Sequence, residues 1–494
     1  MLRPYFRTLS LILAATLMSA CSSASTPVPS TDRSPSMPPP SGSSSGPHAT
    51  PTEPTGGSSP TPASGEAIPV RQDALEVGLG IQMAPGPDGT LFVSIPRVDG
   101  SVQLVRLDAS GRAMTGWPIA LEGARVCSRP VVFANASVRL VCQPVELNQD
   151  LNVGTRVAAF DGTGHPLAGW PVDVDGHVVA SRPIGQDLRL LMFVPLGDVI
   201  EEGVPTHVVG LVSLAPDGQI VEGAVLPLFD SFVEEWAIGP DGIAYGMTFQ
   251  FNSGESSRIT ALGLAGPSAG GPTIVAGLAS APGIGPNGEL VMALGSTVRY
   301  STRVASFDPT GTRPPASSGE LPTAPAEFGD IGGCGIGNPD IPIVASDGTV
   351  VLLSWARDQV FALDPTLVSL RGWPYDAPAP FMRLDPRHVR EDEFCPDRSV
   401  PAFGPDGTLY LALQPHDQTV GSSLVALGSK GEIRPGWPVE LRQACAEFWS
   451  IAVGADGVVH ALAIEPETAT TSSATVVAFA PDSTVIYRTT VIEP

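Results

Sequence analysis

The chain repeats one short motif, and this repetition constrains its fold more than any other feature. A Gly-Trp-Pro triplet occurs four times, and each Trp stands nine residues after an Asp or Gly, at Asp108, Asp161, Asp364 and Gly428. The tryptophans are Trp117, Trp170, Trp373 and Trp437. Trp117 and Trp170 are 53 residues apart, whereas Trp170 and Trp373 are 203 apart, which is about four periods of 51. Three degenerate copies are therefore expected between the second and third triplets.

A second motif marks the same period independently. It is a turn of the Asp-Gly or Asn-Gly type followed by alternating apolar residues, and it occurs at Asp88, Asp241, Asn287, Asp347, Asp406 and Asp456. Gly accepts the positive φ that a tight turn requires, so such a turn between two apolar runs is a strong signal for a β-hairpin. Repeats of about 40 to 55 residues cannot bury their own hydrophobic face, so they are expected to pack as propeller blades or solenoid turns.

Residues 401–441 are the cleanest copy and predict four short strands. The same layout can be traced in eight segments, which begin near residues 80, 130, 182, 234, 280, 341, 400 and 450. We therefore predict an all-β fold, an eight-bladed β-propeller of four-stranded antiparallel blades. The count falls to seven if the weak copy near residue 182 is an insertion. The eighth blade takes its last strand from residues 484–491, unless residues 68–72 pair there and close the ring.

The Trp and Pro of each triplet have an expected structural role that needs no ligand. A large aromatic side chain near the periphery can fill the seam between adjacent blades, where a small sheet lacks area. Proline has no N–H group and is tolerated mainly on edge strands. The four prolines therefore indicate the outermost strand of their blades and protect that strand from pairing with other chains. They are Pro118, Pro171, Pro374 and Pro438.

The first residues of the chain predict export and membrane attachment. Two arginines precede an apolar run, which is typical of a secretory signal peptide over residues 1–20. The small residues before Cys21 resemble a bacterial lipobox, with Met18 where Leu is usual, and this resemblance implies lipidation of Cys21. Several acyl chains would hold the mature protein to a membrane. The alternative is an ordinary signal peptide cut near Ala20, or an uncleaved apolar anchor.

Residues 21–67 are dominated by Ser, Pro, Thr and Gly, so they cannot bury enough apolar surface to fold. We predict a disordered tether over residues 21–67, open to glycosylation, and a propeller over residues 68–494. The protein is expected to be extracytoplasmic and lipid-anchored to a bacterial membrane, in the periplasm or at the cell surface. Its formal net charge of −23 argues against nucleic acid as a partner, because such ligands need a basic surface.

The repeat resembles the quinoprotein-like (PQQ-like) propeller repeats, which pair a Gly-Thr-Leu-Tyr-Leu strand with a Val-Ala-Leu strand and a glycine turn leading to a Trp. The matching residues in the cleanest copy are 407–411, 425–427 and 431–437, and the resemblance spans about residues 76–494. Such repeats occur in quinone-cofactor dehydrogenases and in cofactor-free lipoproteins of bacterial envelope assembly. This chain departs from the pattern because Pro follows each repeat Trp and because it lacks the adjacent cysteine pair that several quinoprotein dehydrogenases place over their cofactor. The resemblance implies the fold, and we expect no cofactor.

The connections fall into a short set and a long set. The hairpins and the turns before the tryptophans are short, whereas the connections between second and third strands and between blades are long. These sets are expected at opposite ends of the ring, and binding normally resides on variable loops that a rigid scaffold presents. Five cysteines lie at the long-loop end, and export favours disulfides. Cys127 and Cys142 would close a 15-residue loop, and one pair is expected among Cys334, Cys395 and Cys445, whose remaining thiol is either structural or catalytic.

The densest polar cluster lies on an interblade loop, residues 385–393. Its candidate binding residues are Asp385, Arg387, His388, Glu391, Asp392 and Glu393. Carboxylates near a His could bind a divalent metal or serve as acid and base, and the alternative is a solvated charge run that pairs internally. Residues 173–177 hint at calcium but lack the closing Glu of a full loop, so we expect a turn. The chain has no Gly-rich phosphate loop, zinc-protease motif or nucleophile elbow, so we assign no catalytic residue and no metal site.

We therefore expect a monomeric ring that binds an envelope protein or a glycan at its long-loop end, without catalysis, and that meets the membrane through its lipid anchor. The alternative is an enzyme, either a quinone-cofactor (PQQ-like) dehydrogenase or a lyase or hydrolase that uses the central funnel. A third possibility is a purely structural envelope spacer.

Overall fold

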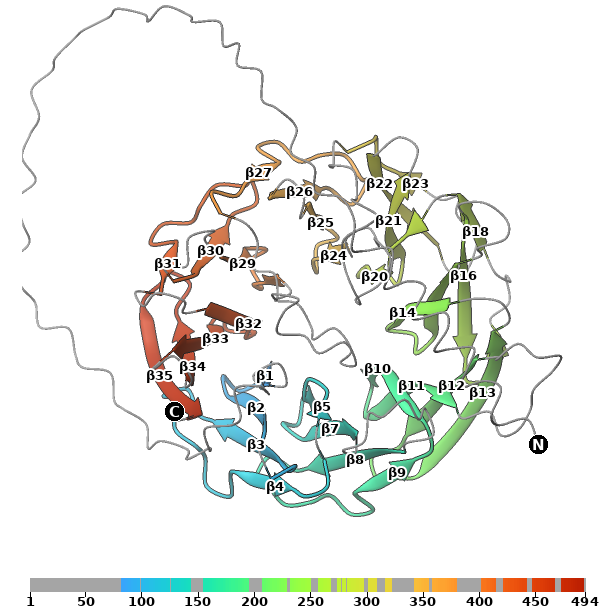
Figure 1. Ribbon diagram of the computed structural model, residues 1–494, viewed down its shortest axis with the longest axis vertical. Helices are drawn as coiled ribbons and strands as arrows, with labels where there is room; N and C mark the ends of the chain where they lie inside the picture. The colour runs from blue at the N-terminus through green and yellow to red at the C-terminus, as the bar shows by residue number, and fades with distance from the viewer. Residues whose placement is uncertain are drawn as a thin grey trace, which may run out of the picture. The chain divides into compact units, whose positions relative to one another are not determined.

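The computed structural model describes residues 81–492 apart from 98, 125, 144–153, 195–206, 229–231, 250–255, 268–272, 277, 281, 297–300, 309–315, 322–341, 355–357, 380–400, 415–420, 442–446 and 467–471. Within this part of the chain the secondary structure is entirely β, and no helix is long and apolar enough to span a membrane. The strands form eight antiparallel sheets, which follow one another along the chain and lie in a ring (Figure 1). The predicted eight-bladed propeller is therefore confirmed.

We name the sheets blades A to H in chain order. Blade A holds β1 (Gln82–Pro85), β2 (Leu91–Pro96), β3 (Val102–Leu107) and β4 (Ile119–Leu121). Blade B holds β5 (Val126–Cys127), β6 (Val131–Val132), β7 (Val138–Gln143), β8 (Thr155–Phe160) and β9 (Val172–Val174). Blade C holds β10 (His177–Ile184), β11 (Asp187–Val194), β12 (His207–Leu214) and β13 (Ile220–Leu228). Blade D holds β14 (Phe232–Ile238), β15 (Ala244–Phe249), β16 (Ser256–Gly263), β17 (Gly266–Pro267) and β18 (Thr273–Ala276).

Blade E holds β19 (Leu278–Ala279), β20 (Gly283–Ile284), β21 (Leu290–Ser296), β22 (Ser301–Phe307) and β23 (Ala316–Ser317). Blade F holds β24 (Ile343–Val344), β25 (Val350–Ser354), β26 (Gln359–Leu363) and β27 (Tyr375–Asp376). Blade G holds β28 (Ala402–Phe403), β29 (Leu409–Leu413), β30 (Ser423–Leu427) and β31 (Val439–Glu440). Blade H holds β32 (Glu447–Val453), β33 (Val459–Pro466), β34 (Ser472–Phe479) and β35 (Val485–Ile492).

Every blade follows the same four-part order from the middle of the ring to its rim, and consecutive strands pair (Figure 1). In blades B and E the innermost strand is broken into two pieces that pair with the same neighbour, and in blade D the outermost strand is broken in this way. These breaks account for the sheets that contain five strands. The predicted four-stranded layout therefore holds in all eight blades.

Each Gly-Trp-Pro triplet forms a joint between its own blade and the next. Gly436 has a φ of 87°, and a Cβ at this position would lie 2.5 Å from the carbonyl oxygen of Asp482 in blade H. The indole Nε1 of Trp437 donates a hydrogen bond of 3.1 Å to the carbonyl of Pro481 in the same turn. The corresponding bonds in other seams join Trp170 to Pro216, at 3.0 Å, and Trp373 to Ser429, at 3.1 Å. All four Trp–Pro peptide bonds are cis, and the outermost strand begins directly after each Pro.

The joint from blade A to blade B differs in one bond. The indole Nε1 of Trp117 is buried and has no hydrogen-bond partner. Its expected acceptor, the carbonyl of Gly162, instead receives a hydrogen bond from Arg106 Nη1. The same guanidinium forms an ion pair of 2.6 Å with Asp88 and donates to Thr90 Oγ1. This buried arginine is therefore satisfied by a carboxylate and two further oxygens.

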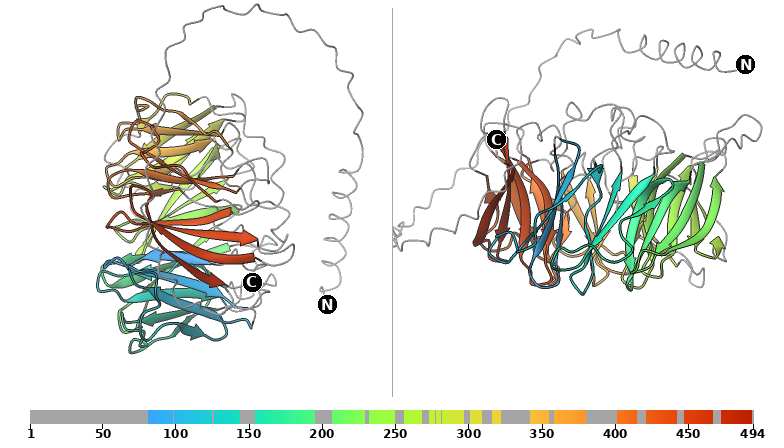
Figure 2. Two further views of the ribbon diagram at one scale, coloured as in Figure 1. Left: turned by 90° about the vertical axis from the view of Figure 1, so that its left-hand side faces the viewer. Right: turned by 90° about the horizontal axis from the view of Figure 1, so that it is seen from below.

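The ring closes between blades H and A by side-chain packing. β35 is the outermost strand of blade H and comes from the segment expected there, whereas residues 68–72 lie outside the described residues. Figure 2 shows the strands of blade H beside those of blade A, and one buried cluster joins Met83 and Leu91 of blade A to Leu462 and Val476 of blade H. Tyr487 belongs to the same cluster, so it fills the closing seam as the repeat Trp does in the four seams that have one.

One core position varies from blade to blade, and in blades A, B, G and H it packs on the rim aromatic of the same blade. Phe92 meets Trp117 edge-to-face, with ring centroids 5.6 Å apart, and Tyr410 meets Trp437 at 5.4 Å. In blade B this place belongs to Arg139, whose guanidinium carbon lies 5.4 Å from the Trp170 ring. In blade H it belongs to His460, 6.0 Å from the Tyr487 ring. The repeat therefore accepts aromatic, cationic and imidazole side chains at one buried position.

Candidate functional site

The two ends of the ring differ in the connections they carry. The hairpins between first and second strands and the turns between third and fourth strands lie at one end, which we call the short-turn end. The connections between second and third strands and between blades lie at the other, the long-loop end. Much of the long-loop end lies outside the described residues, including 144–153, 195–206, 322–341 and 380–400.

Several predicted residues therefore stay predictions. The polar cluster of residues 385–393, with Asp385, Arg387, His388, Glu391, Asp392 and Glu393, lies outside the described residues. The same is true of Cys21, Cys334, Cys395 and Cys445 and of the whole of residues 1–67. Cys127 and Cys142 are described, and they are joined by a disulfide. This predicted disulfide is confirmed, and it braces β5 against β7 through a directly opposed residue pair.

At the short-turn end, aspartate side chains accept hydrogen bonds from other residues of their own turns. Asp161 Oδ1 accepts hydrogen bonds from Thr163 Oγ1 at 2.7 Å, the Thr163 N–H at 2.8 Å and the His165 N–H at 3.0 Å. The bond from the Thr163 hydroxyl is the main reason why the pKa of Asp161 lies below its ordinary value. Asp364 repeats this pattern with Thr366 and Val368. Part of the acidity of the chain therefore serves turn formation.

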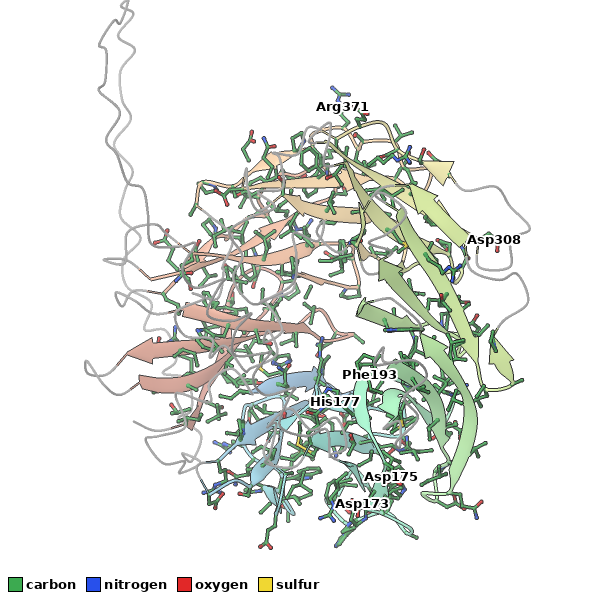
Figure 3. All side chains as sticks on the ribbon, turned by 45° about the vertical axis from the view of Figure 1, so that its right-hand side comes forward. Asp173, Asp175, His177, Phe193, Asp308 and Arg371 are labelled. Atoms are coloured by element: carbon green, nitrogen blue, oxygen red, sulfur yellow. A yellow bond between two sulfur atoms is a disulfide. The ribbon has the colours of Figure 1, made fainter. Side chains whose placement is uncertain are left out.

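At the long-loop end, the seam between blades B and C brings together three side chains of different chemistry. Gln143 ends β7, next to the disulfide, and His177 begins β10, the innermost strand of blade C. Phe193 of β11 is the residue opposite His177 in the strand register. Figure 3 shows His177 and Phe193 close together toward the middle of the ring, with Asp173 and Asp175 nearer its rim. All three side chains of this group are half-buried, and we call Gln143, His177 and Phe193 the mouth cluster.

The hydrogen bonds of the mouth cluster fix the imidazole. Gln143 Nε2 lies 3.3 Å from His177 Nε2 and 3.4 Å from the carbonyl of Val178, to which it donates. An amide nitrogen only donates, so the imidazole Nε2 accepts and the ring proton resides on Nδ1. Burial lowers the pKa of His177, because desolvation disfavours the charged ring. The imidazole is therefore neutral at pH 7, where it can accept a hydrogen bond or a proton.

The neighbouring aspartates do not form a calcium loop. Asp173 lies in β9, and its two carboxylate oxygens accept hydrogen bonds of 2.8 and 3.1 Å from Arg156 Nε and Nη2. Gly176 follows with a φ of 121°, and its carbonyl accepts a hydrogen bond from Thr155 Oγ1 at 2.7 Å. The segment 173–177 is thus an outer strand and a turn that leads into β10.

The described residues do not fit a quinone cofactor with its calcium ion. The disulfide joins residues that are 15 apart in sequence and lie on two strands, whereas the quinoprotein arrangement uses neighbouring cysteines. Among the residues the structure describes, no group of three or more His, Cys, Asp or Glu side chains could hold a metal ion. We therefore derive no reaction step through such a cofactor.

Sequence reasoning did not single out the mouth cluster. In the sequence His177 is only the last residue of an acidic turn, and neither Gln143 nor Phe193 belongs to a motif. The available signal was positional, because all three stand at strand ends that face the long-loop end. Polar or aromatic residues at such positions of a repeat protein deserve a binding hypothesis even without a motif.

Comparison with known proteins gives no family. No protein-family model matches the chain, and no curated protein matches it. Among solved structures it is similar to a streptogramin B lyase, with 15% identity over 77% of this chain and 90% of the other and a TM-score of 0.36. A virginiamycin B lyase from Staphylococcus aureus matches with 12% identity, 63% and 93% coverage and a TM-score of 0.34. A putative 6-phosphogluconolactonase from Bacteroides uniformis matches with 14% identity, 70% and 93% coverage and a TM-score of 0.39. Likenesses this distant carry no argument about function.

Proposed function

We propose that the protein is a membrane-tethered, extracytoplasmic β-propeller lipoprotein that binds an envelope protein or a glycan at its long-loop end, without catalysis. The contrast between the two ends of the ring carries this proposal. At the short-turn end, carboxylates such as Asp161 are bonded within their own turns. At the long-loop end, the mouth cluster offers an amide, a neutral imidazole and an aromatic ring beside a disulfide-braced strand pair. Rigid strands that carry such groups suit recognition of a neutral polar partner.

The disulfide supports the extracytoplasmic part of the proposal. Cys127 and Cys142 are 4% and 1% exposed and lie directly opposite each other, so the bond is structural. Structural disulfides persist in oxidising compartments and are rare in the cytosol. The lipid anchor follows from the sequence around Cys21, and a Cys21→Ser variant should move from the membrane fraction to the soluble periplasmic or extracellular fraction. Retention of that variant in the membrane fraction would refute lipidation at Cys21.

The binding proposal is tested by crosslinking the native lipoprotein in its own membranes and identifying what co-purifies by mass spectrometry. A Gln143→Ala, His177→Ala double variant should lose the partner. A His165→Ala variant is the matched control, because His165 is an exposed histidine of the short-turn end and should retain it. Equal recovery of the partner by both variants would exclude the mouth cluster as the binding site.

A lyase or hydrolase that works in the central funnel is the second candidate. The observation that favours it is a half-buried neutral imidazole at the long-loop end, His177, which could act as a general base if a substrate displaced Gln143 from its Nε2. A screen of ester and glycan substrates should then find turnover that His177→Ala abolishes and His165→Ala keeps. Turnover that survives in His177→Ala would remove this histidine from the reaction.

A further inference from the structure

Two arginines lie directly opposite each other on the inner part of blade C. Arg182 of β10 and Arg189 of β11 are paired residues in the antiparallel register, two pairs before the strands turn. Like charges at opposed positions of a sheet destabilise it, because both side chains project from the same face. A chain with 27 basic and 50 acidic residues could have placed a carboxylate at either position. The pairing therefore calls for an explanation.

Both guanidinium groups reach across the seam to blade D, where they meet carbonyl oxygens. Arg182 Nη1 donates to Ile238 O at 3.0 Å, and Arg189 Nη1 donates to Gly242 O at 3.1 Å. These carbonyls flank the hairpin between β14 and β15 at the short-turn end. A neutral carbonyl satisfies one donor of a guanidinium but does not balance its charge. Two positive charges therefore face one short hairpin.

The nearby carboxylates do not neutralise this pair. Asp241 accepts from the Tyr245 hydroxyl at 2.9 Å and from the Ile243 N–H at 3.0 Å. Asp187 and Asp241 act on Arg189 only through space, and within the described part of the chain neither Arg182 nor Arg189 forms an ion pair. Arg189 Nε is buried and has no hydrogen-bond partner. Buried donors of this kind normally have a partner, and an ion or water is the usual one where the protein supplies none.

Blade A shows how the same fold satisfies an arginine completely. Arg106 also reaches from one blade to the next, to Gly162, but it pairs with Asp88 at 2.6 Å and with Thr90. Its side chain is 4% exposed, so a matched carboxylate makes even deep burial acceptable. The arginines in the seam between blades C and D also reach the next blade, but no carboxylate forms an ion pair with them in the described part of the chain.

Both arginines keep part of their surface exposed to solvent. β10 is the innermost strand of blade C and β14 the innermost strand of blade D (Figure 1), so Arg182 lies on an innermost strand of the ring. Gly185 and Gln186 at the tip of the blade C hairpin are exposed, and so is Asp241 at the tip of the blade D hairpin.

We propose that the seam between blades C and D binds an oxyanion, a phosphate or a carboxylate, between Arg182 and Arg189 at the short-turn end of the ring. Planar guanidinium groups recognise such oxygens with two parallel hydrogen bonds, and their rigid forks favour this geometry. The anion supplies the missing negative charge and relieves the repulsion within the pair. This site is separate from the mouth cluster and stands whether or not the proposed function at the long-loop end is correct.

The test is thermal unfolding and calorimetric titration of the full chain with inorganic phosphate and, separately, with acetate, at constant ionic strength set by chloride. We expect saturable stabilisation by at least one of the two anions, and the preferred one identifies the oxyanion. Arg182→Gln and Arg189→Gln should each weaken that binding by about tenfold or more, which is the effect of losing one charged hydrogen bond. Arg434→Gln is the matched control, because Arg434 pairs with Asp406 at 3.3 Å at the same end of the ring and should leave binding unchanged.

Two results would overturn the proposal. One is stabilisation of the same size in the wild-type chain and in Arg182→Gln, which would indicate a general salt effect. The other is no response of the wild-type chain to either anion beyond that to chloride. Arg182 is only half-buried, so its variant keeps the test valid even if Arg189→Gln fails to fold.

Discussion

Acidification should weaken the closing seam of the ring through one buried histidine. His460 is 2% exposed, and the Tyr487 hydroxyl lies 3.0 Å from its Nδ1. Burial lowers the pKa of His460 to about 4, against a small opposing effect of the Asp456 carboxylate. Burial likewise raises the pKa of Tyr487, which therefore remains a neutral phenol. The seam is thus built for an uncharged imidazole.

The size and sign of the effect follow from linkage. With a pKa of about 4 in the folded state and about 6.5 in the unfolded state, His460 binds more protons when the chain is unfolded throughout the window between those values. Its contribution to stability is complete above about pH 6.5 and is lost as the pH falls toward 4. Between pH 7.5 and pH 5.0 the loss in free energy of unfolding is about 2 kcal/mol.

The assay is urea unfolding of the wild-type protein and of His460→Phe at pH 7.5, 6.0 and 5.0. Phe is a suitable replacement because Phe92 occupies the corresponding position of blade A. Other groups also contribute to the pH dependence, so the measured quantity is the difference in pH dependence between the two proteins. We expect the wild-type protein to lose about 2 kcal/mol more than the variant on going to pH 5.0. Parallel pH profiles would refute the assignment of this proton linkage to His460.

Two further predictions concern the joints and the disulfide. Gly436→Ala should destabilise the protein by about 2 kcal/mol more than Gly407→Ala. Both glycines have a positive φ, but only Gly436 lies against a neighbouring blade, at Asp482. Equal losses of stability in denaturant unfolding would show that backbone strain alone accounts for the effect. Replacing Cys127 and Cys142 by Ser should lower the free energy of unfolding by roughly 3 kcal/mol, the value for closing a loop of this length, and an unchanged urea midpoint would contradict a stabilising role.

The blade count and the blade positions could be predicted because the signals for them are local. A hairpin turn such as residues 404–407 depends on its own Asp and Gly, and its chemistry needs no knowledge of the rest of the fold. The same applies to the turn before Trp437 and to the disulfide, where the two cysteines bracket one strand pair. Signals that lie close together in the sequence, at most 15 residues apart, therefore predicted the strands of each blade.

Contacts between blades could not be read in this way. Tyr487 replaces Trp at the closing seam, and its partner Gly111 is several hundred residues earlier in the chain. The pairing of Arg182 with Arg189 depends on register, and their acceptor carbonyls, those of Ile238 and Gly242, belong to another repeat. Single-sequence patterns do not carry the identity of such partners. Residues 385–393 lie outside the described residues and remain a prediction.

Among the described residues β35 completes blade H, and the strands of each blade follow one another directly in the sequence. A gene that encodes such a ring can gain or lose a whole wedge by duplicating or deleting one stretch of DNA, and no existing sheet is cut. An added blade needs only a rim contact that fits its neighbours. The closing seam already has a rim contact of another kind, because there Thr489 Oγ1 donates a hydrogen bond of 2.6 Å to the carbonyl of Gly111. The number of blades is therefore open to evolutionary change in a way that a ring sealed by a shared strand would not allow.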